Sequence, residues 1–298
     1  SVVVNTGVGA DTITLTAFTP PGGFPGLTLH GGTGDDTIVF NGDITFTAGA
    51  NLNVDLQDDD AAPGVDRITV VGNANLLLSG AGGVVFKVSR DVLFSSGSVL
   101  EVEDGNILME ANQQTTPTTG GFSGLNLSNA RVEATGIGSI ALRGRTGNSG
   151  VYIKGVVIQD GSQVLARSGG IVIVGNGQSG HTNIGNFGVG IGAGGSSWVV
   201  RSVGGNVQIT GVGGSDGGAT LNLGVGIENA SEVSATGEGT VTIEGTGGNV
   251  TGTGSQNHGV YVTTTGANVT TEAGLLTISG TAGGGVGSSN NIGVFLFN

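Results

Sequence analysis

Residues 224–247 read GVGIENASEVSATGEGTVTIEGTG, and residues 259–282 repeat the same pattern as GVYVTTTGANVTTEAGLLTISGTA. In both stretches, short runs of alternating apolar residues are separated by Gly, Asn and acidic residues. A related unit, GVYIKGVVIQDGSQVLARSGGIVIVGNG, begins at Gly150. Self-similarity at a fixed period of roughly 20–50 residues is typical of solenoids, in which one small unit stacks on the next. The sequence therefore predicts a stacked repeat fold.

The repeat is marked by the pattern Asn-x-Gly-Val, which recurs at spacings of 34–38 residues. Its copies begin at Asn148, Asn186, Asn222, Asn257 and Asn291. Identical Asn side chains at one corner of successive turns can hydrogen-bond to one another along the stack, and the Gly two places later suits a positive φ at the bend. These five residues are predicted to form a structural ladder. A row of ligand-binding amides is the alternative.

Each unit contains three strand-like segments, for example residues 225–227, 232–235 and 240–244. Equivalent strands one period apart would lie in register, about 4.8 Å apart, as parallel strands. No window has the apolar periodicity of an amphipathic helix. The predicted fold class is therefore all-β, a parallel β-helix (β-solenoid) with three strands per turn. The twist preference of parallel crossovers predicts a right-handed one.

The two parts of the chain differ in regularity. Residues 1–123 lack the Asn-x-Gly-Val register and are predicted to form irregular N-terminal rungs of the solenoid. Residues 124–298 hold the regular rungs with 34–38-residue repeats, in which Val151 is expected to stack in the interior with Val189. The polar run QQTTPTTGG at residues 113–121 marks the boundary. Both parts are expected to belong to one continuous solenoid.

Composition excludes several classes of protein. The 298 residues include 63 Gly and 5 Pro without a strict triplet, which excludes collagen. A net charge of −13 argues against nucleic-acid binding, which needs a basic surface. No run of about 18 apolar residues occurs, so no membrane-spanning segment is predicted. The absence of cysteine favours an exported bacterial protein.

Two short motifs near the start of the chain suggest a metal. Residues 31–39 read GGTGDDTIV and residues 6–14 read TGVGADTIT. Both resemble the calcium-binding nonapeptide of haemolysin-type (RTX) repeats, with Asp36 and Asp11 at its Asp position. The resemblance implies Ca²⁺ held between successive turns by carboxylates and carbonyls. The copies lie 25 residues apart rather than in tandem, so one rung of that length would be needed to join them. The alternative is a Gly-rich turn before a strand.

No catalytic constellation is visible. A Ser-His-Asp set, a nucleophile elbow and a zinc-binding His pair are all missing from the sequence, so the chain is predicted not to be an enzyme. Pectate lyases, however, place clustered Asp with Arg or Lys on one face of a parallel β-helix. A polysaccharide-binding or polysaccharide-degrading protein of that kind is the alternative function. Six basic residues, which could bind an anionic glycan or be ordinary surface charge, fall in one segment: Arg131, Arg143, Arg145, Lys154, Arg167 and Arg201.

The stretch SRDVLFSSGSVLEVEDGNILMEAN at residues 89–112 and the Asn-x-Gly-Val units are similar to the strand repeats of bacterial large exoproteins of the filamentous-haemagglutinin-like kind. The likeness is one of repeat style and covers most of residues 84–298. It implies secretion, a location at the bacterial cell surface or outside the cell, and a structural or adhesive role in a surface protein or fibre. It implies no catalytic residue.

Both ends of the chain consist of apolar strand sequence, SVVVN and GVFLFN, without a polar cap. A solenoid leaves unpaired N–H and C=O groups on its end rungs, which natural solenoids cover. The predicted partners are therefore flanking rungs of a longer chain or head-to-tail copies of the chain itself. Surface glycans are a further candidate partner.

Overall fold

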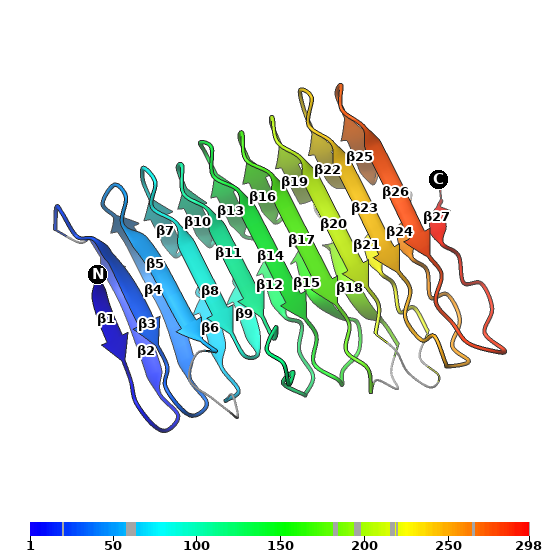
Figure 1. The fold of residues 1–298 in the computed structure, drawn as a ribbon, viewed down its shortest axis with the longest axis horizontal. Helices are drawn as coiled ribbons and strands as arrows, with labels where there is room; N and C mark the ends of the chain where they lie inside the picture. Colours follow the sequence, from blue (N-terminus) through cyan, green and yellow to red (C-terminus); the bar gives the residue numbers. More distant parts are fainter. Residues whose placement is uncertain are drawn as a thin grey trace.

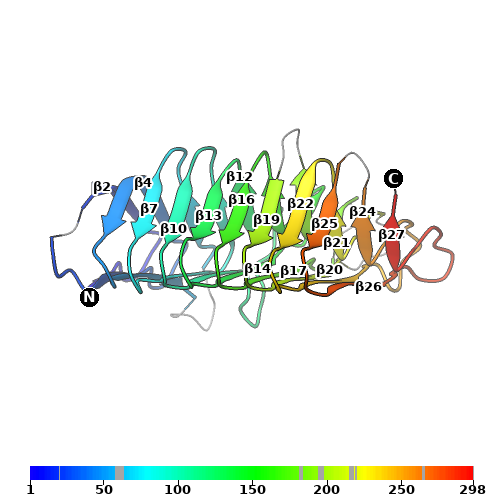
Figure 2. The same ribbon diagram turned by 90° about the horizontal axis from the view of Figure 1, so that it is seen from above.

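The computed structural model describes residues 1–19, 21–57, 64–180, 184–193, 198–214, 218, 220–263 and 266–297. In these residues every regular element is a β-strand and every strand pairing is parallel. Figures 1 and 2 show the strands stacked along the long axis, with the two termini at opposite ends. The predicted all-β parallel solenoid with about three strands per turn is confirmed. Its right-handed sense stays a prediction.

Face 1 of the solenoid is a single sheet that, in the described residues, contains ten strands. In spatial order these are β1 (Val2–Asn5), β3 (Gly26–His30), β5 (Asn51–Leu56), β8 (Val84–Val88), β11 (Ile107–Ala111), β14 (Ile140–Arg145), β17 (Ile171–Asn176), β20 (Val207–Val212), β23 (Val241–Thr246) and β26 (Leu276–Thr281). The sheet continues across the boundary at residues 113–121 without a break, because β11 pairs with β14. Both parts of the chain therefore belong to one solenoid.

The other strands form two further faces. Face 2 contains β6 (Arg67–Val70), β9 (Asp91–Phe94), β12 (Leu125–Ser128), β15 (Ile153–Gln159), β18 (Asn186–Ala193), β21 (Val225–Ile227), β24 (Val260–Val262) and β27 (Val294–Leu296). Face 3, toward the viewer in Figure 2, contains β7 (Asn75–Leu78), β10 (Val99–Val102), β13 (Arg131–Ala134), β16 (Gln163–Ala166), β19 (Trp198–Ser202), β22 (Ser231–Ala235) and β25 (Asn268–Thr271). The longer β2 (Thr12–Phe18) and β4 (Thr37–Phe46) serve both faces, since β4 pairs with β6 through residues 37–40 and with β7 through residues 44–46.

The core consists of apolar columns that run along the axis. Alternate residues of each strand point inward, so in-register pairing places like residues on top of one another. On face 1, Val207, Val241 and Leu276 form one such column, as the sequence predicts. Full burial of a Val, Leu or Ile side chain stabilises by about 1.5–3 kcal/mol. Each additional rung therefore lengthens the core and adds to its stability.

The register of β15 differs from the prediction. Val189 pairs with Val156, five residues after Val151, which is 57% exposed. The prediction that Val151 lies in the interior is therefore wrong. The strand that continues the stack carries Ile153-Lys154-Gly155-Val156, which lacks the Asn but keeps the Gly-Val pair.

Two columns of glycine meet at the corner between faces 1 and 2. Gly175, Gly211 and Gly245 are the second-last residues of their face-1 strands, and an added Cβ on each would overlap the carbonyl oxygen of a glycine at or near the start of the adjacent face-2 strand. Those face-2 glycines, Gly188, Gly224 and Gly259, belong to the Asn-x-Gly-Val units and do not have positive φ. The predicted positive φ is therefore wrong for these three glycines, whereas Gly150 of the first unit does have one, at 114°. The three are needed because two backbones pack directly against each other.

The described residues of the loops before β24 and β27 lie at one edge of the solenoid, at the lower right of Figure 1. They are stacked by main-chain hydrogen bonds. The Asn249 N–H donates to the Gly214 carbonyl at 3.0 Å, and the Gly284 N–H donates to the Gly248 carbonyl at 3.0 Å. The stacking thus extends beyond the strands into the loops.

Candidate functional site

Asp11 and Asp36 lie on adjacent rungs, as their 25-residue separation predicts, because the strands that follow them pair in register. The Asp36 Oδ1 accepts a hydrogen bond from the Asp11 N–H at 2.8 Å, and the Asp66 Oδ1 accepts one from the Asp36 N–H at 2.8 Å. Ser89 takes the next place, with its hydroxyl accepting from the Asp66 N–H at 2.9 Å. These carboxylates therefore satisfy main-chain donors of the preceding rung.

The glycines of the nonapeptide-like motif also have a structural cause. An added Cβ on Gly31 would lie 2.5 Å from the Asp36 Oδ2, and one on Gly32 or Gly34 would overlap the main chain of the rung below. Within the described ranges, no group of three or more His, Cys, Asp or Glu side chains is placed to hold an ion. The neighbouring Asp58, Asp59 and Asp60 lie outside the described residues. Calcium binding by Asp11 and Asp36 stays a prediction.

Substitution of Asp36 separates the structural role from the metal role. Asp36 is 1% exposed, and Asp36→Ala removes the acceptor of the Asp11 N–H, so a loss of about 1–3 kcal/mol of unfolding free energy is expected in urea denaturation. Asp36→Asn keeps an acceptor oxygen and is expected to lose less. If Ca²⁺ binds here, titration calorimetry shows binding to the wild type at millimolar Ca²⁺ and none to Asp36→Asn. No heat with the wild type would eliminate the calcium site.

The Asn ladder exists, and its members Asn186, Asn222 and Asn257 are buried, whereas Asn291 is half-buried. The Asn222 N–H and Nδ2 both donate to the Asn257 Oδ1, at 3.0 and 2.9 Å. The Asn257 N–H and Nδ2 donate in turn to the Asn291 Oδ1, at 2.9 and 3.2 Å. Asn186 belongs to the same column, with its N–H 3.3 Å from the Asn222 Oδ1. The Asn side chains hydrogen-bond to one another along the column, which favours the structural ladder over a ligand-binding row.

Asn148 is not a member of this ladder. Because β15 is shifted, Ile153 is the residue that pairs with Asn186. The Asn148 side chain instead accepts a hydrogen bond from the Gly120 N–H at 2.9 Å. The predicted five-membered ladder therefore begins at Asn186.

A strip of buried side chains lies on the outer side of face 2, and it was not predicted from the sequence. The residue before Gly in each unit occupies one slot, and Lys154, Phe187, Leu223 and His258 in that slot are at most 7% exposed. Repeated bulk at this slot was the available signal. Only the correct register of β15 shows that Lys154 shares this slot with Phe187. The strip shields the strands beneath it from solvent.

Charged groups lie within this strip. The Lys154 Nζ lies 5.0 Å from the centre of the Phe187 ring and donates to the Tyr152 carbonyl at 3.2 Å. Burial lowers the pKa of Lys154, and the nearby Glu228 partly opposes that shift. Burial raises the pKa of Glu228, opposed in turn by Lys154, and burial together with Glu228 raises the pKa of Tyr261. One ammonium and one carboxylate thus share a partly desolvated site.

His258, Tyr261 and Phe295 form a cluster of nearly parallel rings, with centroids 5.5 Å apart for His258 and Tyr261, 5.1 Å for His258 and Phe295, and 5.5 Å for Tyr261 and Phe295. Its Nδ1 accepts a hydrogen bond from the Ile292 N–H at 3.1 Å. Burial lowers the pKa of His258, and protonation of Nδ1 would also break the hydrogen bond from the Ile292 N–H. Because His258 is 4% exposed and contacts both neighbouring rings, this cluster stabilises the strip and offers little open imidazole surface for a ligand.

The lowered pKa of His258 predicts a loss of stability in acid. The unfolded chain protonates this histidine near pH 6.5, whereas the folded protein does so only at lower pH, so the unfolding free energy should fall as the pH drops below about 6.5. Urea denaturation at pH 7.5 and 5.5 measures the change. Glu228 acts in the opposite direction because its pKa is raised. The His258 contribution is therefore the difference between the wild type and His258→Gln. Equal pH dependence in both proteins would refute it.

The basic residues of the middle segment do not form one patch. Arg143 lies on face 1 with its Nη1 3.3 Å from the Glu110 carboxylate, Arg145 ends the same strand, and Lys154 lies in the strip on face 2. Arg131, Arg167 and Arg201 belong to face 3 or its edge. The grouping seen in the sequence is therefore separated by the fold onto three faces.

Face 3 carries acidic and basic side chains on its outer surface. The Arg131 guanidinium bridges two carboxylates, 2.9 Å from Glu101 and 2.6 Å from Glu133. Arg201 lies 3.9 Å from Glu232. Arg167, which is exposed, forms no ion pair in the part of the chain that the structure describes. On this face several charged groups of both signs line surface hollows.

None of the protein-family models, curated proteins or solved structures compared with this chain matches it. The similarities to filamentous-haemagglutinin-like exoproteins and to RTX repeats stay predictions. The described part of the chain contains no helix capable of crossing a bilayer.

Proposed function

We propose that this chain is a structural or adhesive segment of a secreted bacterial surface protein or extracellular fibre, and not an enzyme. The observation that carries the proposal is the uninterrupted stack from β1 to β26, in which each rung serves as the template for the next. Such a stack is a spacer and display surface whose length is set by the number of repeats. The cysteine-free composition with 10% charged residues is consistent with a large exported repeat protein.

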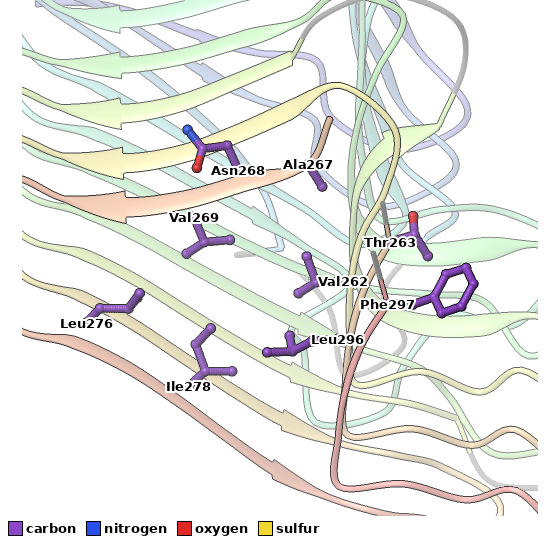
Figure 3. A pocket seen from close by; sticks show the side chains of 9 residues that line it. All are labelled: Val262, Thr263, Ala267, Asn268, Val269, Leu276, Ile278, Leu296 and Phe297. Atoms are coloured by element: carbon purple, nitrogen blue, oxygen red, sulfur yellow. The ribbon is translucent and has the colours of Figure 1, made fainter. Parts of the chain in front are cut away.

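The two ends of the stack support an assembly role. At the C-terminal end a hollow of about 390 Å³ opens into the core (Figure 3), lined by apolar side chains such as Val262, Val269 and Ile278. Leu296 beside it is 63% exposed. At the other end Val2 is 48% exposed, in the column that the core side chains of face 1 continue. In the proposal, flanking rungs of a longer chain or head-to-tail copies cover these side chains.

Sedimentation velocity of the purified chain tests this proposal. Since end-to-end contact buries apolar side chains, the average mass is expected to rise above 29.0 kDa as the concentration increases. A variant with Leu296→Lys and Phe297→Lys places charges at the open end and is expected to remain a monomer. A wild type that stays monodisperse and monomeric at every concentration would count against an end-to-end role.

A carbohydrate-active enzyme remains the second candidate, because carboxylates and arginines share one face. In a β-helix lyase or hydrolase these groups would act on a sugar chain bound across the strands. Incubation with acidic polysaccharides, followed by an assay for new reducing ends, is expected to detect no turnover. Turnover that disappears in Glu133→Gln would replace the structural proposal with the enzymatic one.

A further inference from the structure

We propose that face 3 binds a linear polysaccharide that carries carboxylate groups, in an outer groove defined by Glu101, Glu103, Thr135, Arg167 and Arg201. Two hollows form this groove. One is lined by Glu101, Glu103 and Thr135, and the other by Thr135, Arg167 and Arg201. Glu133 also lines the second hollow, and because Thr135 lines both, the two hollows adjoin each other on face 3. The inference deepens the adhesive role proposed above and rests on it for its biological meaning.

Strand register sets the direction of the groove. Glu101 pairs with Glu133, which pairs with Leu165, which pairs with Arg201. These residues form a row parallel to the solenoid axis, across β10, β13, β16 and β19, which lie side by side in Figure 2. Glu103, Thr135, Arg167 and Val203 each lie two residues later and flank that row. A polymer lying in this groove therefore runs along the axis and crosses successive rungs.

The charges of the groove favour an acidic ligand at one end. Arg131 pairs with both Glu101 and Glu133, so its single positive charge offsets one of these two carboxylates. Arg167 has no ion-pair partner in the described residues, and Arg201 makes only a 3.9 Å contact with Glu232. Two guanidinium groups in one hollow thus present donors in the forked geometry that matches carboxylate oxygens. The acidic end of the groove supplies acceptors for sugar hydroxyls, as Glu103 does for the Gly80 N–H at 2.7 Å.

The size of the groove favours a sugar chain over a protein. From β7 to β19 there are four strand spacings of about 4.8 Å, so the groove is roughly 19 Å long and, with strands of four residues, roughly 250 Å² in area. A stable protein–protein contact needs about 800 Å² on each partner. The smaller area suits a few sugar rings. The floor of the groove is a hydrogen-bonded sheet whose main chain is already ordered, so binding costs little free energy for ordering the main chain.

Titration calorimetry of the whole chain with oligogalacturonate, and with a neutral dextran oligomer of similar length, tests the proposal. Binding of oligogalacturonate that weakens as salt is raised is expected, with at least a tenfold loss of affinity in Arg167→Gln and in Arg201→Gln. Arg167→Lys keeps the charge but loses the fork, and an intermediate loss is expected. Arg143→Gln, which removes an exposed arginine on face 1, is the matched control and should bind as the wild type does.

Several results would overturn the inference. These are no oligogalacturonate binding at millimolar concentration, equal binding of dextran, and wild-type affinity in Arg167→Gln. Because Arg167 is exposed, the variants should keep the wild-type thermal unfolding curve, and each one is checked for this before titration. Sedimentation behaviour does not depend on these arginines. A failure of glycan binding can therefore be distinguished from a failure of the assembly proposal.

Discussion

Replacement of Gly211 by alanine is expected to lower the free energy of unfolding by about 3 kcal/mol, the upper range for overpacking a filled interior. An added Cβ there would overlap the Gly224 carbonyl oxygen and lie 2.8 Å from the Val225 Cγ2. The nearest obstacle is the Gly224 main chain, which cannot rotate out of the way, and the Val225 side chain beside it is completely buried. Faces 1 and 2 would have to move apart at that corner. Urea denaturation followed by circular dichroism measures the loss.

Gly22→Ala is the matched control. Nothing lies within 4 Å of a Cβ added at Gly22, and its φ is not in the left-handed region. A surface substitution of this kind changes stability by no more than about 0.5 kcal/mol. Equal stability of the Gly211 and Gly22 variants would show that the two backbones do not meet as closely as described.

Asn257→Ala is expected to cost about 3 kcal/mol. The Asn257 side chain accepts two hydrogen bonds from Asn222 and donates to the Gly254 carbonyl at 2.7 Å and to the Asn291 Oδ1. Asn257 is completely buried, so water cannot replace these partners, and each buried group left unsatisfied costs about 1–3 kcal/mol. Urea denaturation measures the change, and hydrogen exchange at the Asn222 amide would locate it.

Asn148→Ala tests the same ladder from outside it. Asn148 is half-buried and accepts a single hydrogen bond, from Gly120. Its replacement is expected to cost about 1 kcal/mol, the net value of one ordinary hydrogen bond. A loss in Asn148→Ala as large as that in Asn257→Ala would mean that Asn148 belongs to the ladder after all.

The fold followed from the sequence because solenoid stacking is a local rule. Each unit needs only the preceding one, so the spacing between copies predicted the parallel pairing of β18, β21 and β24. The error at Asn148 has a physical cause. A second Gly-Val pair, Gly155-Val156, follows Gly150-Val151 by five residues. Only the length of chain needed to reach the corner between faces 1 and 2 decides which pair joins the stack. The 38-residue spacing from Asn148 to Asn186, the longest of the set, was the available warning.

The outer surfaces were harder to predict than the core. Interior positions can be recognised in the sequence because apolar residues recur at every second position of a strand. Outward positions follow no such pattern. Arg201 and Glu133 come together only through two successive pairings, each more than thirty residues long in sequence. An error of one position in either pairing would turn one of these side chains inward. The groove on face 3 and the strip on face 2 therefore required the register itself.

The parallel pairing of every rung determines how this molecule would respond to a pulling force. In a solenoid the hydrogen bonds between strands point along the long axis, so tension applied at the two ends loads the bonds of one rung boundary at a time. The outermost rung yields first and the rest of the stack remains folded. A released repeat of 34 residues can extend to roughly 110 Å. The solenoid would therefore lengthen in steps under load, one repeat at a time.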